Sequence, residues 1–391
     1  MEPHSDMPFS RREFVTALPV AILAAPGVVK AAEPTFLRAA VVGHTGRGDY
    51  GHGLEGIFQN RPGIELVALA DPDDAGRKKI AEKIRAPRSY ADYREMLAKE
   101  KPRLVSVAMR HADLHHEIIL TCLKAGAHVY AEKPFTRTPA EADELLAEAG
   151  RRGLKIAVAH TMRLAPQMTR FRQALREGLI GEVVEMRAYG KQDARAGGED
   201  LMVLGSHLTD LMRALAGDPI SCSARVLQQG RPITKSDARL VKDNVGLVAG
   251  DEVFASFAFP NGVNASFTSS ARLKETVGEW GIEVLGSKGA ARINCDVPAL
   301  VFVRRSGKWT PAGRNDEWTP LDAKDLRTVS ETRMNPVTDW LDAIAKNREP
   351  ECSGRNGAWA VEMVMAVYHS SLAGGAPVAF PLKVRTHPLA P

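Results

Sequence analysis

The chain has 391 residues, of which 44% are hydrophobic and 25% are charged, as is usual for globular proteins. The formal net charge is +5, but charges of both signs alternate along the chain and no basic run interleaves with aromatic residues. These features exclude a disordered or fibrous protein, and they argue against nucleic-acid binding.

The first 32 residues have the order of a twin-arginine export signal. Arg11 and Arg12 precede a mostly apolar stretch that ends at Val29, and small residues follow at Ala31 and Ala32. Prolines interrupt this stretch, which is shorter than the roughly 20 residues that a membrane-spanning helix needs. We therefore expect cleavage near residue 32, a mature protein without a membrane partner, and a periplasmic or otherwise exported location.

Between residues 33 and 160, short apolar runs alternate with amphipathic stretches. This alternation predicts an α/β fold with a doubly wound parallel sheet, because buried parallel strands are continuous apolar runs. The predicted strands are Leu37–Val42, Glu65–Ala70, Arg103–Ala108, Ala127–Ala131 and Lys155–Ala159. The predicted helices are Asp73–Lys83, Leu114–Ala125 and Pro139–Arg152.

A glycine-rich segment follows the first predicted strand. Gly43, Gly46 and Gly48 would let the backbone approach a pyrophosphate, whose charge the amides of the next helix could meet. The match to the GxGxxG pattern is imperfect, because Thr45 stands at the middle glycine position. With Arg47, these residues are the candidate cofactor-binding loop.

Asp71 ends the second predicted strand. A carboxylate at this place can accept hydrogen bonds from the adenosine ribose and would repel a 2′-phosphate, so it favours NAD over NADP. The same residues also form a good turn and helix start. Arg47, Arg77 and Lys78 could accommodate a phosphate, so NADP is not excluded.

Glu132, Lys133 and Pro134 end a later strand of the same predicted sheet. Ligands bind beyond the carboxyl ends of parallel strands, so a lysine there can reach both a nicotinamide and a substrate hydroxyl. The alternative is a solvated strand end. We take Lys133 as the leading candidate for chemistry.

The second half is richer in strand-like runs. They are Glu182–Tyr189, Glu252–Phe259, Val263–Ser269, Gly281–Gly286 and Leu300–Arg304, and helices are expected at Pro336–Lys346 and Gly357–Leu372. Asn261 and Gly262 between two of the runs indicate a β-hairpin. The four cysteines lack the spacing of a metal site, so no metal is expected, and a disulfide stays open.

In this order the motifs resemble the glucose–fructose oxidoreductase and inositol dehydrogenase family, Gfo/Idh/MocA. The matching segments are Gly43–Gly51, Ala68–Asp71, Tyr93–Leu97, His115, Ala125–Pro134, Gly178–Val183, Gly205–Asp210, Ile282–Gly289 and Gly375–Val378. The resemblance implies a Rossmann domain at 33–160 and a C-terminal α/β domain at 161–391 with a large open, mostly antiparallel sheet. It also implies a homo-oligomer, a dimer or tetramer, formed through the exposed face of that sheet.

The resemblance also carries residue roles. It implies that Lys133 contacts substrate and nicotinamide next to Glu132, that His115 lies at the cofactor, and that His207 is a general base beside the substrate. Asp210 either orients His207 or simply caps and solvates its helix.

Position 203 departs from the family pattern, which has Asp four residues before the histidine. Here the residue is Val203, so either Asp200 or Glu199 takes over the proton chemistry or that chemistry differs. Asp200 could instead be a helix N-cap.

The resemblance implies that one further side chain lines the site, and two more follow the first strand of the second domain; all three could bind a hydroxyl-rich or acidic substrate. They are Arg163, Tyr189 and Lys191, and ordinary surface chemistry is the alternative for each.

The sequence therefore predicts an exported NAD(P)-dependent oxidoreductase that acts on a sugar, polyol or glycoside with a tightly bound cofactor. A redox-neutral glycosidase that oxidises, eliminates, hydrates and reduces its substrate is the alternative, and Val203 fits it. A third reading is a nucleotide-holding binding protein without turnover, which only Val203 supports.

Overall fold

A computed structural model describes residues 36–273, 280–295, 300–306, 317–321 and 329–391. The export signal predicted at 1–32 lies outside these residues. Residues Phe36–Pro391 form one compact unit with two sheets. No helix in the described part of the chain combines the length and the apolar character that crossing a membrane requires.

The first sheet is wholly parallel. Its order is β3-β2-β1-β4-β5-β6. The strands are β1 (Leu37–Val42), β2 (Ile64–Ala70), β3 (Ser89–Tyr90), β4 (Leu104–Val107), β5 (His128–Ala131) and β6 (Ile156–Val158). This is a doubly wound sheet whose order reverses between β1 and β4, so the prediction of fold class is confirmed. Ligands bind at such a reversal, beyond the carboxyl ends of the strands.

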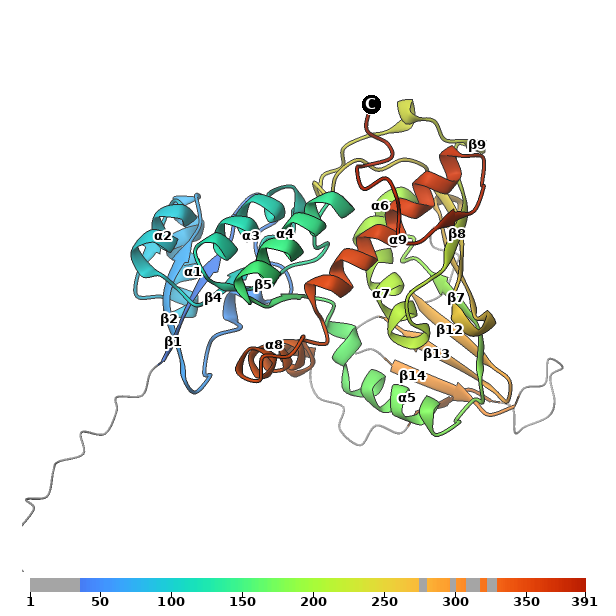
Figure 1. The fold of residues 1–391 in the computed structure, drawn as a ribbon, viewed down its shortest axis with the longest axis horizontal. Helices are drawn as coiled ribbons and strands as arrows, with labels where there is room; N and C mark the ends of the chain where they lie inside the picture. The colour runs from blue at the N-terminus through green and yellow to red at the C-terminus, as the bar shows by residue number, and fades with distance from the viewer. Residues whose placement is uncertain (1–35, 274–279, 296–299, 307–316, 322–328) are drawn as a thin grey trace, which may run out of the picture. The chain divides into compact units, whose positions relative to one another are not determined.

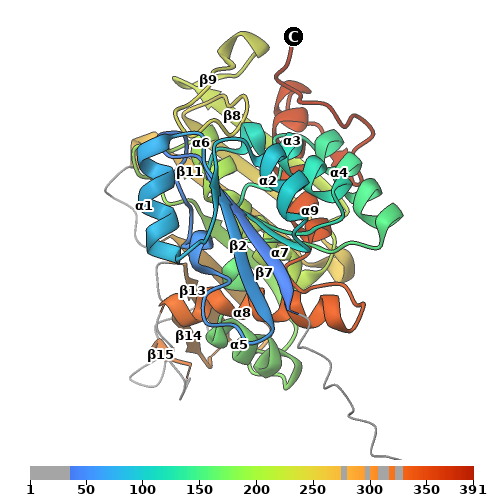
Figure 2. The same cartoon turned by 90° about the vertical axis from the view of Figure 1, so that its left-hand side faces the viewer.

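Helices cover both faces of this sheet (Figures 1 and 2). The helices α2 (Tyr93–Glu100), α3 (His115–Lys124) and α4 (Pro139–Arg152) pack on one face, and α1 (Asp74–Ile84) packs on the other. Asp73 caps α1 by accepting a hydrogen bond from the Gly76 amide (2.6 Å), as the turn-and-helix reading of this segment anticipated.

A helix from the end of the chain completes the second face. The ring of Trp340, in α8 (Val329–Ala345), is fully buried and lies 5.7 Å from the ring of Tyr130 in β5. The helix was expected near Pro336–Lys346, but it begins earlier, at Val329, so that Pro336 lies inside α8. The domain boundary at 160/161 stays a prediction. Although α8 belongs to the second predicted domain, it packs on the sheet of the first.

The second sheet has ten strands among the described residues, in the order β15-β14-β13-β12-β7-β11-β10-β8-β16, with β9 beside β8. Among the described strands of this sheet, only β7 and β11 pair in parallel. The strands are β7 (Val183–Tyr189), β8 (Ser221–Gln228), β9 (Arg231–Pro232), β10 (Glu252–Ala258), β11 (Asn264–Ser270), β12 (Gly281–Gly286), β13 (Ala290–Asn294), β14 (Leu300–Arg304), β15 (Thr319–Pro320) and β16 (Val378–Ala379). A mostly antiparallel second sheet was predicted, and it is confirmed.

The predicted hairpin joins β10 to β11. Asn261 and Gly262 both have positive φ, 60° and 74°, and the Phe259 amide bonds the Val263 carbonyl at 2.8 Å. Asn and Gly tolerate this left-handed backbone, which explains why the pair was a reliable signal.

One face of the second sheet is covered by helices (Figure 1). They are α5 (Pro166–Arg176), α6 (Gly198–Val203), α7 (Gly205–Ala216) and α9 (Gly354–Leu372). Because α9 contacts β8, α4 and β6, one hydrophobic core runs from the first sheet into the second. The opposite face carries the exposed side chains of Arg225, Phe254 and Ser256.

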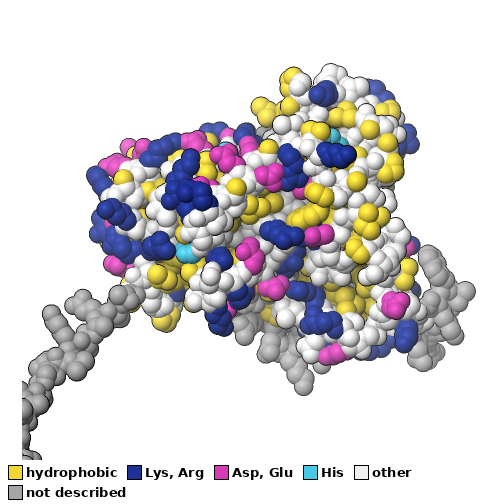
Figure 3. All heavy atoms as spheres, in the orientation of Figure 1, with side chains coloured by type: hydrophobic (Ala, Val, Ile, Leu, Met, Phe, Trp, Pro, Cys, Tyr) yellow, Lys and Arg dark blue, Asp and Glu magenta, His cyan; other side chains and the backbone are white. Residues whose placement is uncertain are grey.

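Three further features concern the surface charge, the thiols and the side chains that could bind a metal. Figure 3 shows basic and acidic side chains interspersed on the face drawn, so their fields largely cancel there. Cys122, Cys222 and Cys352 are buried free thiols, and burial raises the pKa of Cys122 to about 12. Among the described residues, no three His, Cys, Asp or Glu side chains are grouped to hold a metal ion.

Candidate active site

Lys133 lies just beyond the carboxyl end of β5, and its side chain reaches the second half of the chain. Its Nζ donates a hydrogen bond to the carbonyl oxygen of Val203, the last residue of α6 (3.1 Å). Lys133 is only 8% exposed. Burial lowers its pKa, and Glu132 opposes that shift. An ammonium group with so little water around it is a strong donor to an oxygen that gains negative charge.

A polar cavity of 310 Å³ lies beside Lys133. Tyr50 and His52 from the glycine-rich segment line it, together with Arg110, Arg195 and Asp243. A small pocket with charges of both signs suits a compact, hydroxyl-rich molecule.

Glu132 is fully buried behind this cavity and forms a close pair with His52. Its Oε1 lies 2.5 Å from His52 Nδ1, and its Oε2 accepts a hydrogen bond from the Lys133 amide (3.0 Å). Although burial favours the neutral acid, His52 and Lys133 hold the pKa of Glu132 below its usual value. Gly51 makes the approach possible, since a Cβ there would lie 2.2 Å from Glu132 Oε1.

His207, in α7, is 5% exposed and packs among aromatic rings. Its ring centroid lies 6.1 Å from that of His52, 5.5 Å from His160 and 5.8 Å from Trp280. Its buried Nδ1 has no hydrogen-bond partner in the described part of the chain. Burial and the nearby Lys133 lower the pKa of His207 well below its usual value, so the ring is neutral at neutral pH.

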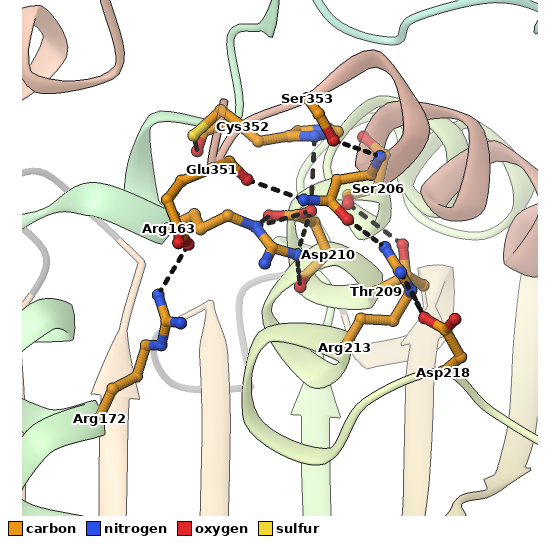
Figure 4. Close-up of polar contacts among 12 residues, drawn as sticks. Arg163, Arg172, Ser206, Thr209, Asp210, Arg213, Asp218, Glu351, Cys352 and Ser353 are labelled. Carbon is orange, nitrogen blue, oxygen red and sulfur yellow. Dashed lines mark hydrogen bonds and ion pairs between the residues drawn. The ribbon is translucent and has the colours of Figure 1, made fainter. Parts of the chain in front are cut away.

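Asp210 and Arg163 form a buried ion pair (Figure 4). Arg163 donates to the Asp210 carboxylate from Nε (3.0 Å) and Nη2 (2.7 Å). The imidazole nearest to the carboxylate is that of His160, whose Nδ1 lies 3.8 Å away. Two expected roles are therefore corrected. Asp210 binds Arg163 rather than orienting His207, and Arg163 binds Asp210 rather than a substrate.

Asp200 fixes the loop after β7. Its buried carboxylate accepts hydrogen bonds from the Ser269 hydroxyl (2.6 Å) and from the amides of Gln192 (3.0 Å) and Lys191 (3.2 Å). The N-cap of α6 is Gly197, so the reading of Asp200 as an N-cap was wrong. Its three donors make it a structural clamp, and the group that meets Lys133 is the main chain of Val203.

Tyr189 and Lys191 lie where β7 ends, and neither lines the cavity beside Lys133. Tyr189 is half-buried at the end of β7, and Lys191 is exposed. The Nζ of Lys191 lies 5.9 Å from the centroid of the Trp280 ring, which also packs against His207. Lys191 is thus connected to the site through Trp280.

The glycine-rich segment closes over Asp71. The buried carboxylate accepts hydrogen bonds from the Thr45 amide (3.0 Å), the Thr45 hydroxyl (2.7 Å) and the Tyr50 hydroxyl (2.7 Å). The Tyr50 ring lies against Gly43, where a Cβ would be 2.1 Å from it. Gly48 has a φ of 86°, and a Cβ there would lie 2.6 Å from the His111 amide nitrogen.

A second cavity, also of 310 Å³, opens at the ends of β1 and β2. Gly43, Asp71, Tyr93, Arg94 and Ile118 are among its lining residues. The two cavities flank the glycine-rich segment, one placed for an adenosine and the other beside Lys133, as a dinucleotide requires. The ring of Tyr50 lies between them, so the site fits a dinucleotide once that ring leaves Gly43 and Asp71.

Replacing Tyr50 by Phe should tighten NAD binding to the unloaded protein by about twofold to tenfold, because one competing hydrogen bond to Asp71 is lost. Isothermal titration calorimetry measures the change. Tyr90→Phe, which removes a hydroxyl bonded to Glu100 (2.5 Å), is the matched control. Unchanged or weaker affinity in Tyr50→Phe would show that Tyr50 does not compete with the ribose.

His115 braces the segment that carries Lys133. It is fully buried, with Nδ1 2.8 Å from the Pro134 carbonyl oxygen and Nε2 2.8 Å from that of Met109. The expectation of a cofactor contact is therefore corrected: the ring bridges the segments that follow β4 and β5.

Two arginines that could have met a 2′-phosphate are engaged elsewhere. Arg47 pairs with Asp113. Arg77 donates to the Asp71 carbonyl oxygen (2.8 Å) and pairs with Asp74. These contacts agree with the preference for NAD that Asp71 indicates.

Tyr50 and His52 were not singled out from the sequence. The available signal was their position, because both are bulky side chains inside a glycine-rich segment at a strand end. Only the fold shows that one meets Asp71 and the other meets Glu132, 80 residues away in the chain.

Comparison with known proteins identifies related families in both halves. The family described as "Oxidoreductase family, NAD-binding Rossmann fold" matches residues 37–160, and the "GFO/IDH/MocA C-terminal domain" matches residues 168–292. The D-apiose dehydrogenase of Paraburkholderia graminis is 26% identical over 324 residues, which are 80% of this chain and 82% of that protein.

Two solved structures share the fold. A levoglucosan dehydrogenase in complex with NADH and levoglucosan has a TM-score of 0.72 at 19% identity, covering 88% of this chain and 99% of that one. The aldose–aldose oxidoreductase of Caulobacter crescentus, complexed with glycerol, has a TM-score of 0.68 at 19% identity, covering 88% and 99%.

Proposed function

Because the chain belongs to the Gfo/Idh/MocA family of oxidoreductases, we propose that it moves a hydride between a hydroxyl-bearing carbon of a sugar, polyol or glycoside and a tightly held NAD, outside the cytoplasm. The observation that carries this proposal is the buried ammonium of Lys133 beside a polar cavity at the mouth of an NAD-binding fold. A relative named D-apiose dehydrogenase supports a carbohydrate substrate.

Different residues of the chain would bind the cofactor, stabilise the reacting oxygen and accept the proton. The loop from Gly43 to Gly48 and the carboxylate of Asp71 would hold the dinucleotide, which supplies the hydride acceptor. Lys133 donates a hydrogen bond to the reacting oxygen and stabilises the charge that develops there. A neutral imidazole of the site takes the hydroxyl proton. The family resemblance predicts His207 for this role.

Export constrains the net reaction. Free nicotinamide nucleotides are not expected to be replenished outside the cytoplasm, so the bound cofactor must return to its starting oxidation state in every cycle. Oxidation of one aldose coupled to reduction of a second carbonyl compound meets this requirement. The structural neighbour named as an aldose–aldose oxidoreductase supports it.

Val203 favours a second candidate, the redox-neutral glycosidase. That reaction oxidises a hydroxyl, eliminates the aglycone, adds water and reduces the product again. Position 203 offers a carbonyl to Lys133 and no carboxylate to an imidazole, which suits altered proton chemistry. Release of free sugar from a glycoside without added oxidant would favour this candidate over net oxidation.

The purified protein should release NAD(H) in close to stoichiometric amount when it is denatured, as measured by enzymatic cycling of the supernatant. A panel of aldoses and glycosides incubated with the native protein then separates the two candidates. A supernatant free of pyridine nucleotide, from a protein with no affinity for NAD or NADP, would refute the proposal. Bound nucleotide without turnover of any carbohydrate would instead favour the third hypothesis, a nucleotide-holding binding protein.

Location and assembly belong to the same proposal. Cell fractionation tests the exported location, and replacing Arg11 and Arg12 by lysine should keep the protein in the cytoplasm. We also propose a dimer or tetramer formed through the open face of the second sheet, which carries Phe254, and sedimentation analysis tests it.

A further inference from the structure

The imidazole that lines the cavity beside Lys133 is that of His52. Its side chain is 24% exposed, and the cavity is bordered by His52 and Lys133 together. His207 is 5% exposed and lies behind His52, with the two ring centroids 6.1 Å apart. Of these two rings, a molecule in the cavity therefore meets His52 first.

Glu132 fixes the tautomer of this ring. Its carboxylate is ionised and can only accept hydrogen bonds, so His52 Nδ1, 2.5 Å away, must carry the proton. With Nδ1 engaged by Glu132, Nε2 is the ring nitrogen left to accept a proton, and no described residue is hydrogen-bonded to it. A buried carboxylate that orients an imidazole whose other nitrogen stays open is the arrangement of a general base.

The backbone at residues 51 and 52 allows His52 and Glu132 to lie this close together. Gly51 lacks the Cβ that would lie 2.2 Å from Glu132 Oε1. His52 has a φ of 49°, a left-handed conformation that is uncommon outside glycine and often marks a functional site.

Resting on the proposed function, we propose that His52 is the catalytic base, oriented by Glu132, and that it replaces the carboxylate missing at position 203. The substrate O–H proton passes to His52 Nε2 while the hydride leaves the same carbon for the bound oxidised nicotinamide. The products are a carbonyl, a reduced nicotinamide and an imidazolium paired with the Glu132 carboxylate. In the reverse direction His52 returns the proton. His207 is then a packing neighbour of the base.

Acylation mapping tests this assignment without any turnover. Diethyl pyrocarbonate acylates an accessible neutral imidazole nitrogen, and peptide mass spectrometry identifies the site. In the native protein freed of nucleotide, His52 should be modified several times faster than His207, and saturating NAD together with glycerol should slow modification of His52. Faster modification of His207, or no protection of His52, would overturn the proposal.

A variant designed for the backbone gives the second test. His52→Gly suits the left-handed φ and leaves a hole that exogenous imidazole can fill. With the best substrate of the aldose panel, kcat should fall at least about a hundredfold, and added imidazole should restore at least tenfold of it. Nucleotide content should stay unchanged, and imidazole should not rescue Lys133→Met.

The matched control is His116→Ala. His116 belongs to another imidazole–carboxylate pair, with Glu144 at 2.8 Å, and its side chain is also 24% exposed, but it does not line the cavity. Its loss should leave kcat unchanged. Retention of kcat in His52→Gly, or a loss that imidazole does not restore, would overturn the role of His52 and leave the proposed function standing. A wild-type protein inactive on the whole panel would count against the proposed function alone, because acylation mapping still decides the role of His52.

Discussion

Replacing Lys133 by Met should lower kcat by about a hundredfold to a thousandfold, because one preorganised donor to the reacting oxygen is lost. Met is unbranched and close to Lys in size, so it should fit the buried path to Val203 without a cavity. Removing the charge removes its desolvation cost but also leaves the Val203 carbonyl without this donor, so the free energy of unfolding should change by less than about 2 kcal/mol. Steady-state kinetics, bound nucleotide and a denaturant melt measure the three quantities.

Lys155→Met is the control for this substitution. Lys155 is half-buried just before β6 and does not border the cavity, so kcat should not change. A second readout is the pKa of His207, which burial lowers most and Lys133 lowers further; in Lys133→Met it should rise in part, as NMR titration would show. Unchanged kcat would refute the assignment of Lys133. Loss of nucleotide together with kcat would move Lys133 from the substrate to the cofactor.

The fold of the first half was predictable because its strands are buried on both faces. Each of the five predicted strands agrees with the observed bounds to within one residue at either end, since continuous apolar runs have clear limits. By contrast, β8 was missed: its sequence alternates serine and arginine with apolar residues, as a half-covered antiparallel strand does. The two-residue strand β3 carries too few residues for any periodic signal.

The candidate site was only partly predictable. Lys133 and His207 could be named from local motifs, and the structure brings both to one region. Their partners depend on contacts between distant segments, such as Lys133 with the main chain of Val203, 70 residues away. Helical spacing suggested that Asp210 serves His207, but the carboxylate turns to Arg163, because a buried charge requires an opposite one.

That buried pair gives the second large expected effect. Asp210→Asn or Arg163→Met alone should each reduce the free energy of unfolding by about 3–5 kcal/mol, because each leaves an uncompensated buried charge. The double variant should lose much less than the sum of the two, because it leaves no charge behind. Urea melts at pH 7 measure the cycle. Glu95→Gln, which breaks the exposed pair with Lys99, should change stability by less than about 1 kcal/mol.

The pair also predicts a pH dependence with a definite sign. Although burial favours the neutral acid, Arg163 holds the pKa of Asp210 below its ordinary value in the folded protein. A carboxylate with a depressed folded pKa contributes stability above its unfolded pKa of about 3.9, and that contribution is lost as the pH falls through the folded value. Asp210→Asn should therefore flatten the acid limb of the stability curve below about pH 4. If Arg163→Met instead kept full stability and raised KM for the sugar, the pair would be a substrate-binding device and the structural reading of Figure 4 would be wrong.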